Sequence, residues 1–207
     1  MKRFAWLFGL LTLMLLVSAS CSKTNLVSSW KDTAYGGGYL ESILLVMVTD
    51  NVDNRRVFEE TFVKAFSGRG VEAVSSLSVI PDGNNIDDAV IIKEASTRGM
   101  KAICVSNLVS VGDKVIYRHS PTAHSSGTPG LSLFSYDYQH LQDYANHTGY
   151  HERRKYVKLE SRIYETATEK VIWSMSSETI DPQSVNKAIQ SLSRAVMKNL
   201  KRHGLIK

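Results

Sequence analysis

Hydrophobic and polar residues form blocks along this chain that predict strands and helices in turn. Residues 43–48 are a continuous aliphatic run, which is typical of a strand buried on both faces of a sheet. Phe58, Phe62 and Phe66 then recur at helical spacing and predict a helix over residues 54–67. The chain therefore begins its folded part with a central strand followed by a helix.

The next blocks continue this alternation. Residues 71–80 are predicted to form a second strand, residues 87–98 a second helix capped by Asp87, and residues 102–111 a third apolar strand. Short connections between strand, helix and strand favour right-handed crossovers. The three strands are therefore expected to pair largely in parallel.

The period changes in the C-terminal part. Residues 156–165 and 171–175 alternate between apolar and polar side chains, which predicts an antiparallel hairpin with one buried face. Apolar residues then recur at helical spacing from Val185 to Leu200, so a final helix should pack on the sheet. The expected fold is α/β, with a two-layer or three-layer-like mixed sheet and the element order β-α-β-α-β-β-β-α.

The N-terminus has the pattern of a bacterial export signal. Lys2 and Arg3 precede a largely apolar run of 14 residues at positions 4–17, and small residues lead from there to Cys21. A helix needs roughly 20 apolar residues to cross a bilayer, so a permanent span is the poorer interpretation. The order resembles lipoprotein signal peptides, which implies that residues 1–20 are removed and that Cys21 carries lipid, including palmitate.

Ser18 leaves a second processing route open. Lipoprotein signals resemble one another in an aliphatic residue three positions before the cysteine, where this chain has Ser18. Cleavage after Ala19 is the alternative, and it would give a soluble periplasmic or secreted protein. If Cys21 is lipidated, the resemblance to known sorting signals implies an anchor in the outer membrane rather than the inner one, because Ser22 follows the cysteine. The domain is expected to face the periplasm.

Residues 21–40 are polar and glycine-rich and predict a flexible tether, although Trp30 favours a short edge strand at residues 27–31. Residues 41–207 are expected to form a single domain. The net charge of +5 includes Lys2 and Arg3, and so small a surplus does not indicate nucleic acid as a partner.

A long segment at residues 118–154 lacks clear periodicity and holds five of the six histidines. Connections of this length are usually functional or disordered. A surface for a partner or ligand is therefore expected at Tyr136, Tyr138, His140, Tyr144, His147, Tyr150 and His151. His147 and His151 are the one pair at close spacing that could suit zinc, and surface histidines explain them better, so no metal site is predicted.

Motifs for catalysis are not found. The sequence has no Gly-x-Ser-x-Gly elbow, and its carboxylate pairs lie at expected helix starts. Cys104 lies within an apolar stretch and is interpreted as a small buried hydrophobe. We therefore expect no catalytic residues, no cofactor and no enzymatic activity.

Several short motifs resemble a widespread family of uncharacterised bacterial envelope lipoproteins. They are Ile43-Leu44-Leu45-Val46, Arg55-Arg56 with Glu59, Gly70-Val71-Glu72-Ala73-Val74, Val171-Ile172-Trp173-Ser174 and the ending from Leu200 to Ile206. The order of elements is also similar to the periplasmic domain of the curli-secretion lipoprotein and to lipoprotein activators of penicillin-binding proteins, an analogy of fold only.

Two main hypotheses for function follow from these observations, and a hydrolase that acts on envelope polymers ranks third behind them. The first is a lipid-anchored, non-enzymatic envelope protein that binds another protein or helps to assemble an envelope complex. The alternative is an envelope receptor that binds a small ligand or a metal through the tyrosine- and histidine-rich segment.

Overall fold

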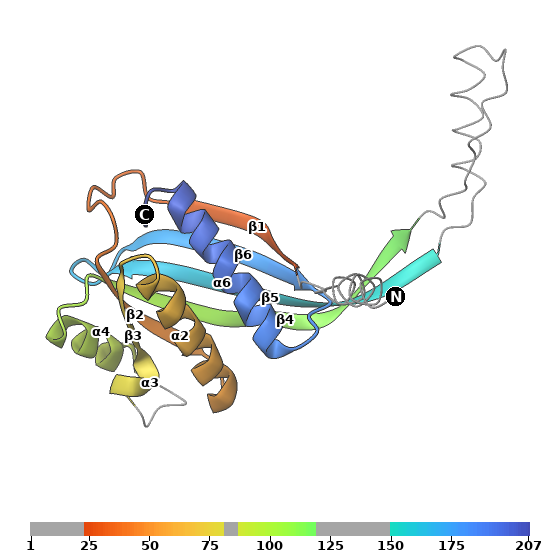
Figure 1. Ribbon diagram of the computed structural model, residues 1–207, viewed down its shortest axis with the longest axis horizontal. Helices are drawn as coiled ribbons and strands as arrows, with labels where there is room; N and C mark the ends of the chain where they lie inside the picture. The colour runs from red at the N-terminus through yellow and green to blue at the C-terminus, as the bar shows by residue number, and fades with distance from the viewer. Residues whose placement is uncertain (1–22, 81–86, 119–149) are drawn as a thin grey trace, which may run out of the picture.

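A single mixed sheet organises the protein (Figure 1). The structure is a computed structural model that describes residues 23–80, 87–118 and 150–207. Six strands follow the spatial order β1-β6-β5-β4-β2-β3. Their bounds are β1 Lys23–Lys31, β2 Ser42–Val48, β3 Glu72–Ser75, β4 Ala102–Arg118, β5 Tyr150–Glu165 and β6 Val171–Ile180.

The strand directions match the sequence prediction. β2 pairs in parallel with both β3 and β4, so the two strand-helix-strand units are crossovers as expected. β4, β5, β6 and β1 follow one another in antiparallel pairs, and β5 with β6 is the predicted hairpin. The α/β class and the predicted order of elements are confirmed, with β1 and a short helix added to them.

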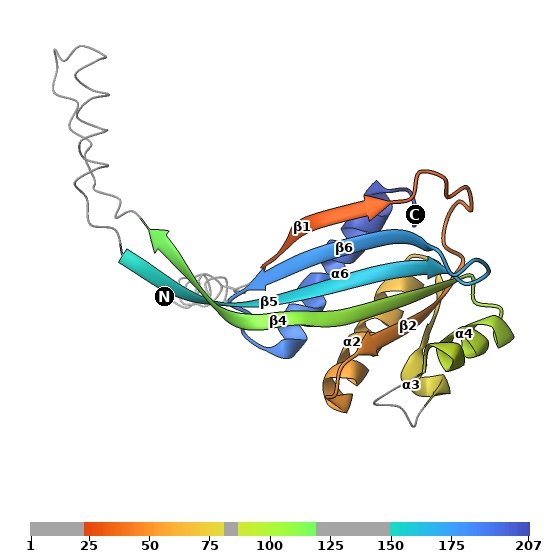
Figure 2. The ribbon, with the colours of Figure 1, turned by 180° about the vertical axis from the view of Figure 1, so that it is seen from behind.

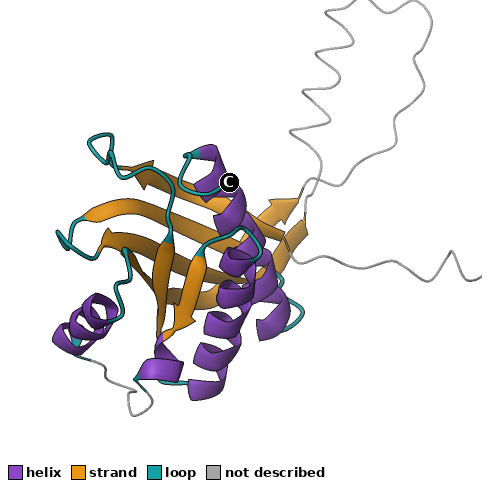
Figure 3. Cartoon of the chain, turned by 60° about the vertical axis from the view of Figure 1, so that its left-hand side comes forward, coloured by secondary structure: helices purple, strands orange, loops and turns teal. Residues whose placement is uncertain are grey.

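β2 is buried on both faces, as its continuous apolar run predicts. Ile43 and Leu45 face a core formed with α2 (Val52–Ser67) and the C-terminal helix α6 (Val185–Arg202). Leu44 faces the opposite core, which includes Ala95 of α4 (Asp88–Thr97). Helices therefore cover both faces of the parallel strands, and this half of the molecule has three layers (Figure 3).

The antiparallel half has two layers. Ile163 of β5 and Trp173 of β6 are fully buried in the core that α6 covers. Arg162 and Ser174 pair across the same strands but point to the other face, where Arg162 is exposed. Among the described residues, no helix packs on that face, which explains the polar side chains there.

The N-terminal part differs from the predicted tether. Residues 23–31 form β1, which pairs with β6 along its length and lies at the edge of the sheet. The edge strand that Trp30 favoured is therefore present and begins earlier than residue 27. The hydrophobic pattern does not reveal the start of this strand, because an edge strand with one open face has few apolar positions.

The second strand is shorter than predicted. β3 ends at Ser75, and residues 76–79 form the short helix α3. The strand stops there because the hydroxyls of Ser75 and Ser76 both donate hydrogen bonds to the buried carboxylate of Glu59 on α2.

None of the described helices is long and apolar enough to span a membrane.

Candidate functional site

Most of the sequence-predicted site lies outside the described residues. Cys21 lies there, as do Tyr136, Tyr138, His140, Tyr144 and His147. Tyr150 and His151 are the first residues of β5, with their backbones opposite Arg118 and Tyr117 of β4. A partner or ligand surface formed by these tyrosines and histidines therefore stays a prediction. In the described ranges, no three His, Cys, Asp or Glu side chains lie close enough to hold a metal ion.

β4 and β5 continue well beyond the rest of the sheet and form a two-stranded ribbon (Figures 1 and 2). We define the ribbon as residues 110–118 of β4 with residues 150–158 of β5. β2 pairs with β4 only as far as Asn107, and β6 pairs with β5 only from Tyr156 onward. Over most of its length the ribbon therefore has no strand on either side among the described residues.

The ribbon exposes aliphatic side chains on one face. Val111 lies opposite Val157, which packs partly against the core that α6 covers, and Val115 lies opposite Arg153. The side chain of Val111 is 65% exposed and that of Val115 is 57% exposed. Val109, at the irregularity where β4 leaves the sheet, is also exposed. Asp113 and Lys155 pair between these valines on the same face, so the valines belong to a mixed apolar and charged surface on a projecting element, which we call the ribbon surface.

Ion pairs and backbone bonds fasten the base of the ribbon to the body. Asp181, just after β6, accepts a hydrogen bond from the backbone N–H of Lys155 at 3.0 Å and donates its own N–H to the carbonyl of Lys155 at 2.8 Å. Its carboxylate also lies 3.1 Å from the guanidinium of Arg154. On the other strand, the Lys114 ammonium lies 3.2 Å from Glu178. These contacts fix the direction in which the ribbon leaves the sheet.

Tyr156 supports the same region from the opposite face. Its ring lies against Gly112, where an added Cβ would come within 3.2 Å of the phenol oxygen. The Lys158 ammonium lies 5.6 Å from the centre of the ring, within the range of a cation–π contact.

The sequence analysis did not predict that β4 and β5 extend beyond the sheet, although residues 114–117 (Lys-Val-Ile-Tyr) have the β-branched and aromatic composition of a strand.

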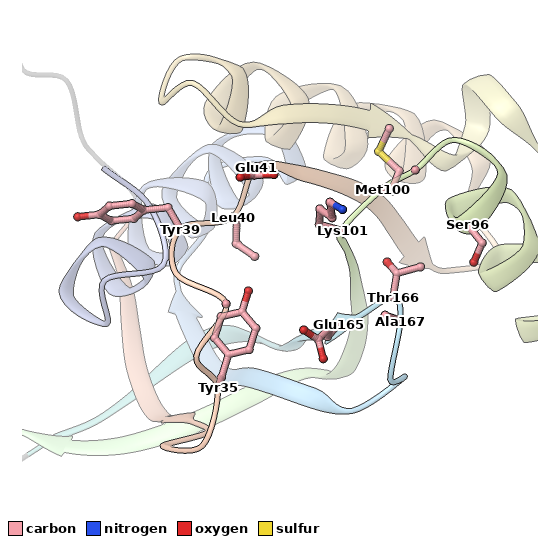
Figure 4. Close-up of a pocket in the computed structure, with 12 residues that line it drawn as sticks. Tyr35, Tyr39, Leu40, Glu41, Ser96, Met100, Lys101, Glu165, Thr166 and Ala167 are labelled. Carbon is pink, nitrogen blue, oxygen red and sulfur yellow. The ribbon is translucent and has the colours of Figure 1, made fainter.

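A cavity of about 470 Å³ lies at the end of the sheet where β2 and β4 begin (Figure 4). Tyr35, Glu41, Lys101 and Glu165 contribute polar groups to its wall. Burial, followed by the negative charges of Glu165 and Glu41, raises the pKa of the Tyr35 phenol. The phenol therefore stays protonated at neutral pH and could donate a hydrogen bond to a small polar molecule.

A buried charged network lies at the opposite end of the parallel strands. The carboxylate of Glu59 is fully buried and accepts five hydrogen bonds, which come from the backbone N–H groups of Met47 and Leu77, the hydroxyls of Ser75 and Ser76 and the guanidinium of Arg55. Both carboxylate oxygens are saturated by these donors, so the carboxylate links α2 to β2, β3 and α3. This is the arrangement of a structural ion pair.

Cys104 is buried in the core beside these strands, as the sequence predicts. Burial raises the pKa of its thiol to about 12, with a smaller opposing effect from the hydroxyl of Ser106. Because the thiolate is the reactive species, this cysteine is chemically inert in the folded protein.

Comparison with known proteins gives structural matches alone. Neither a protein-family model nor a curated protein matches the sequence. The PelC dodecamer from Paraburkholderia phytofirmans is 12% identical, with 86% of this chain and 97% of that chain covered and a TM-score of 0.46. Lipoprotein GNA1162 from Neisseria meningitidis is 14% identical, with 78% and 99% covered and a TM-score of 0.42. The minor lipoprotein from Acinetobacter baumannii is 7% identical, with 79% and 94% covered and a TM-score of 0.35. The last two are named as lipoproteins.

Proposed function

We propose that this chain is a lipid-anchored, non-enzymatic envelope protein that binds another protein through the ribbon surface. The observation that carries the proposal is the ribbon itself, a projecting pair of strands with exposed aliphatic side chains. Val111 and Val115 lie four residues apart on one face of it and are both more than half exposed. Exposed apolar side chains that gather on one element and are bordered by polar groups are a feature of protein–protein interaction sites.

The edges of the ribbon add to this argument. An isolated pair of strands is marginally stable in water, and its unpaired N–H and C=O groups are ready to pair with another strand. Within residues 110–118 and 150–155, the described structure pairs β4 and β5 only with each other and with Asp181. A partner that adds a strand or covers the valines would gain both backbone hydrogen bonds and apolar contact.

The anchor places this surface close to a membrane. Lys23, the first residue of β1, pairs with Ile180 of β6, and Ile180 pairs with Tyr156 at the base of the ribbon. Cys21 precedes Lys23 by two residues. A lipid on Cys21 would therefore hold the base of the ribbon at the periplasmic face of the outer membrane, where we expect the partner to be a membrane-bound or membrane-proximal envelope protein.

The absence of enzymatic activity is part of the proposal and rests on the chemistry of the described side chains. The buried acid Glu59 has its oxygens occupied by five donors, and the buried thiol of Cys104 is held protonated. Both groups support a structural interpretation. The alternative, a receptor for a small ligand or a metal, depends on residues such as His140 and His147 that lie outside the described ranges.

Photo-crosslinking in intact cells tests the ribbon surface. A photoreactive amino acid is placed at Val111 or Val115, and at Val90 of α4 as a control with a comparable exposed aliphatic side chain. We expect both ribbon positions to capture the same protein and Val90 to capture none. Capture of lipid alone at the ribbon positions, or the same product at all three, would refute the proposal.

The anchor has its own test. Cys21→Ser should abolish labelling with a fatty-acid analogue and release the chain from the membrane fraction into the periplasm. Ser22→Ala serves as the control, because it leaves the cysteine in place and should keep the lipid label. A Cys21→Ser chain that is still labelled would contradict lipidation at this residue.

A further inference from the structure

The solvent face of α6 carries a row of basic side chains. Five basic residues and no acidic ones occur between Val185 and Arg202. At 3.6 residues per turn, their spacing places them on one exposed stripe along the helix. We call these residues the basic stripe: Lys187, Arg194, Lys198, Lys201 and Arg202, all of them exposed.

The beginning of β1 lies beside the basic stripe and extends it. The backbone N–H of Thr24 donates to the hydroxyl of Ser191 on α6 at 2.9 Å. A groove of about 490 Å³ runs between the two elements, with Lys23 on the β1 side and Lys198 on the helix side. None of the residues that line this groove is acidic. Lys23, from the other end of the sequence, therefore adds its positive charge to those of the α6 side chains.

The C-terminal end of α6 also lies in a positive environment. The Lys31 ammonium donates to the carbonyl of His203 at 3.1 Å. Burial, followed by the positive charges of Arg202 and Lys31, lowers the pKa of the His203 imidazole. β1 therefore lies against the C-terminal part of α6, with Lys23 lining the groove beside Ser191 and Lys31 bonded to His203.

We propose that the basic stripe, together with Lys23, binds the phosphate groups of anionic phospholipids in the membrane that holds the lipid anchor. This inference rests on the proposed lipidation of Cys21. Two residues of extended chain span about 7 Å, so a lipidated Cys21 would keep Lys23 within a Debye length of the headgroups. The sequence predicts a loose tether between the anchor and the domain. With Lys23 this close to the headgroups, the domain would instead lie on the membrane.

The shape of the surface favours a membrane over a single bound anion. The stripe extends over roughly 22 Å from Lys187 to Arg202 at 1.5 Å per residue. Its cationic side chains are exposed along the helix and do not converge on one enclosed site. A row of exposed charges matches an array of headgroups, and each cation near an anionic surface strengthens binding roughly fivefold.

Vesicle flotation tests the proposal with the full chain carrying Cys21→Ser, exported and recovered from the periplasm, so that no acyl chain contributes. The vesicles are either neutral phosphatidylcholine or phosphatidylcholine with 30% phosphatidylglycerol, a composition set by the experiment and in the range where cations bind measurably. The test variant adds Lys198→Gln and Lys201→Gln. The matched control adds Lys64→Gln and Lys93→Gln, which remove two exposed lysines from α2 and α4.

We expect the Cys21→Ser chain to float with anionic vesicles only, and to lose this binding as salt is raised. The test variant should partition about 30-fold more weakly, from roughly fivefold for each lost cation, while the control stays close to the parent. Equal flotation with neutral vesicles, no flotation with anionic ones, or equal weakening of test and control would overturn the proposal. Lipid labelling of the wild-type chain is scored separately, so failure of the anchor is distinguished from failure of the stripe.

Discussion

Glu59→Gln should strongly destabilise the fold, because it removes the counterion of a buried arginine. The Arg55 and Glu59 side chains are 3% and 0% exposed and lie 3.0 Å apart. Removing one partner of a buried ion pair typically costs about 3–5 kcal/mol, since the remaining charge stays buried without compensation. The glutamine amide would also place an NH₂ group where an oxygen now accepts two hydrogen bonds.

The substituted amide cannot satisfy all five donors. The Oε2 atom accepts from the Ser75 hydroxyl and from the backbone N–H of Leu77 at 3.0 Å. A hydroxyl can rotate to accept from an NH₂ group, but a backbone N–H cannot, and an unsatisfied buried donor costs about 1–3 kcal/mol. We therefore expect a total loss of about 4–8 kcal/mol, most of it from the lost charge, out of the 5–15 kcal/mol typical of a domain.

Urea denaturation followed by circular dichroism measures this loss, with Glu60→Gln as the control. Glu60 is the exposed neighbour on the same helix, so its substitution should change the free energy of unfolding by no more than about 0.5 kcal/mol. Replacing Arg55 and Glu59 together by methionine should cost less than the sum of the single changes, because no unpaired charge remains. A loss below about 1 kcal/mol for Glu59→Gln would refute the reasoning.

Three further predictions concern the core and the end of α6. Cys104, with its pKa raised to about 12, should not react with a maleimide at pH 8 until urea unfolds the chain; reaction in the folded state would contradict its burial. Asn199→Ala removes the acceptor 2.9 Å from the buried indole N–H of Trp173, and should lower the free energy of unfolding by about 1–3 kcal/mol; an unchanged urea midpoint would show that the bond contributes nothing. Because the pKa of His203 is lowered in the folded chain, protonation of this imidazole favours the unfolded chain. The neutral imidazole's contribution to the free energy of unfolding is therefore complete above the ordinary pKa of about 6.5 and is lost as the pH falls below it. His203→Gln should therefore flatten the fall in stability between about pH 7 and pH 5, and an unaltered pH dependence would exclude this role.

The parts of the fold that the sequence reveals are those whose burial is uniform along an element. Residues 43–48 are apolar throughout because both faces of β2 are covered, and the phenylalanines of α2 lie at helical spacing because one face is covered. Phe58 and Phe62 stack with their ring centres 4.2 Å apart in that core. In these elements, local pattern and tertiary environment agree.

The parts that were missed depend on contacts distant in sequence. β1 contributes few apolar residues, since it lies at the edge of the sheet, and its place is fixed by pairing with β6 about 150 residues later. The change from β3 to α3 follows from hydrogen bonds to Glu59, which lies 16 and 17 residues earlier. Neither contact leaves a periodic pattern in the local sequence.

The candidate sites likewise divide into one that the sequence reveals and others that depend on contacts distant in sequence. Cys21 could be identified from sequence because export signals are linear patterns. The ribbon surface could not, because the exposure of Val111 and Val115 results from where β2 and β6 stop pairing with their neighbours. The groove between Lys23 and α6 likewise forms only when residues from the two ends of the chain come together.

Amide hydrogen exchange on the complex with the protein captured at Val111 and Val115 tests the central claim most directly. The ribbon amides of residues 110–118 and 150–155 should exchange rapidly in the free chain, since β4 and β5 there have no further strand partners among the described residues. Binding should slow exchange at these amides and leave those of α4 unchanged. Slower exchange elsewhere with an unaltered ribbon would contradict the assignment of the ribbon as the protein-binding element.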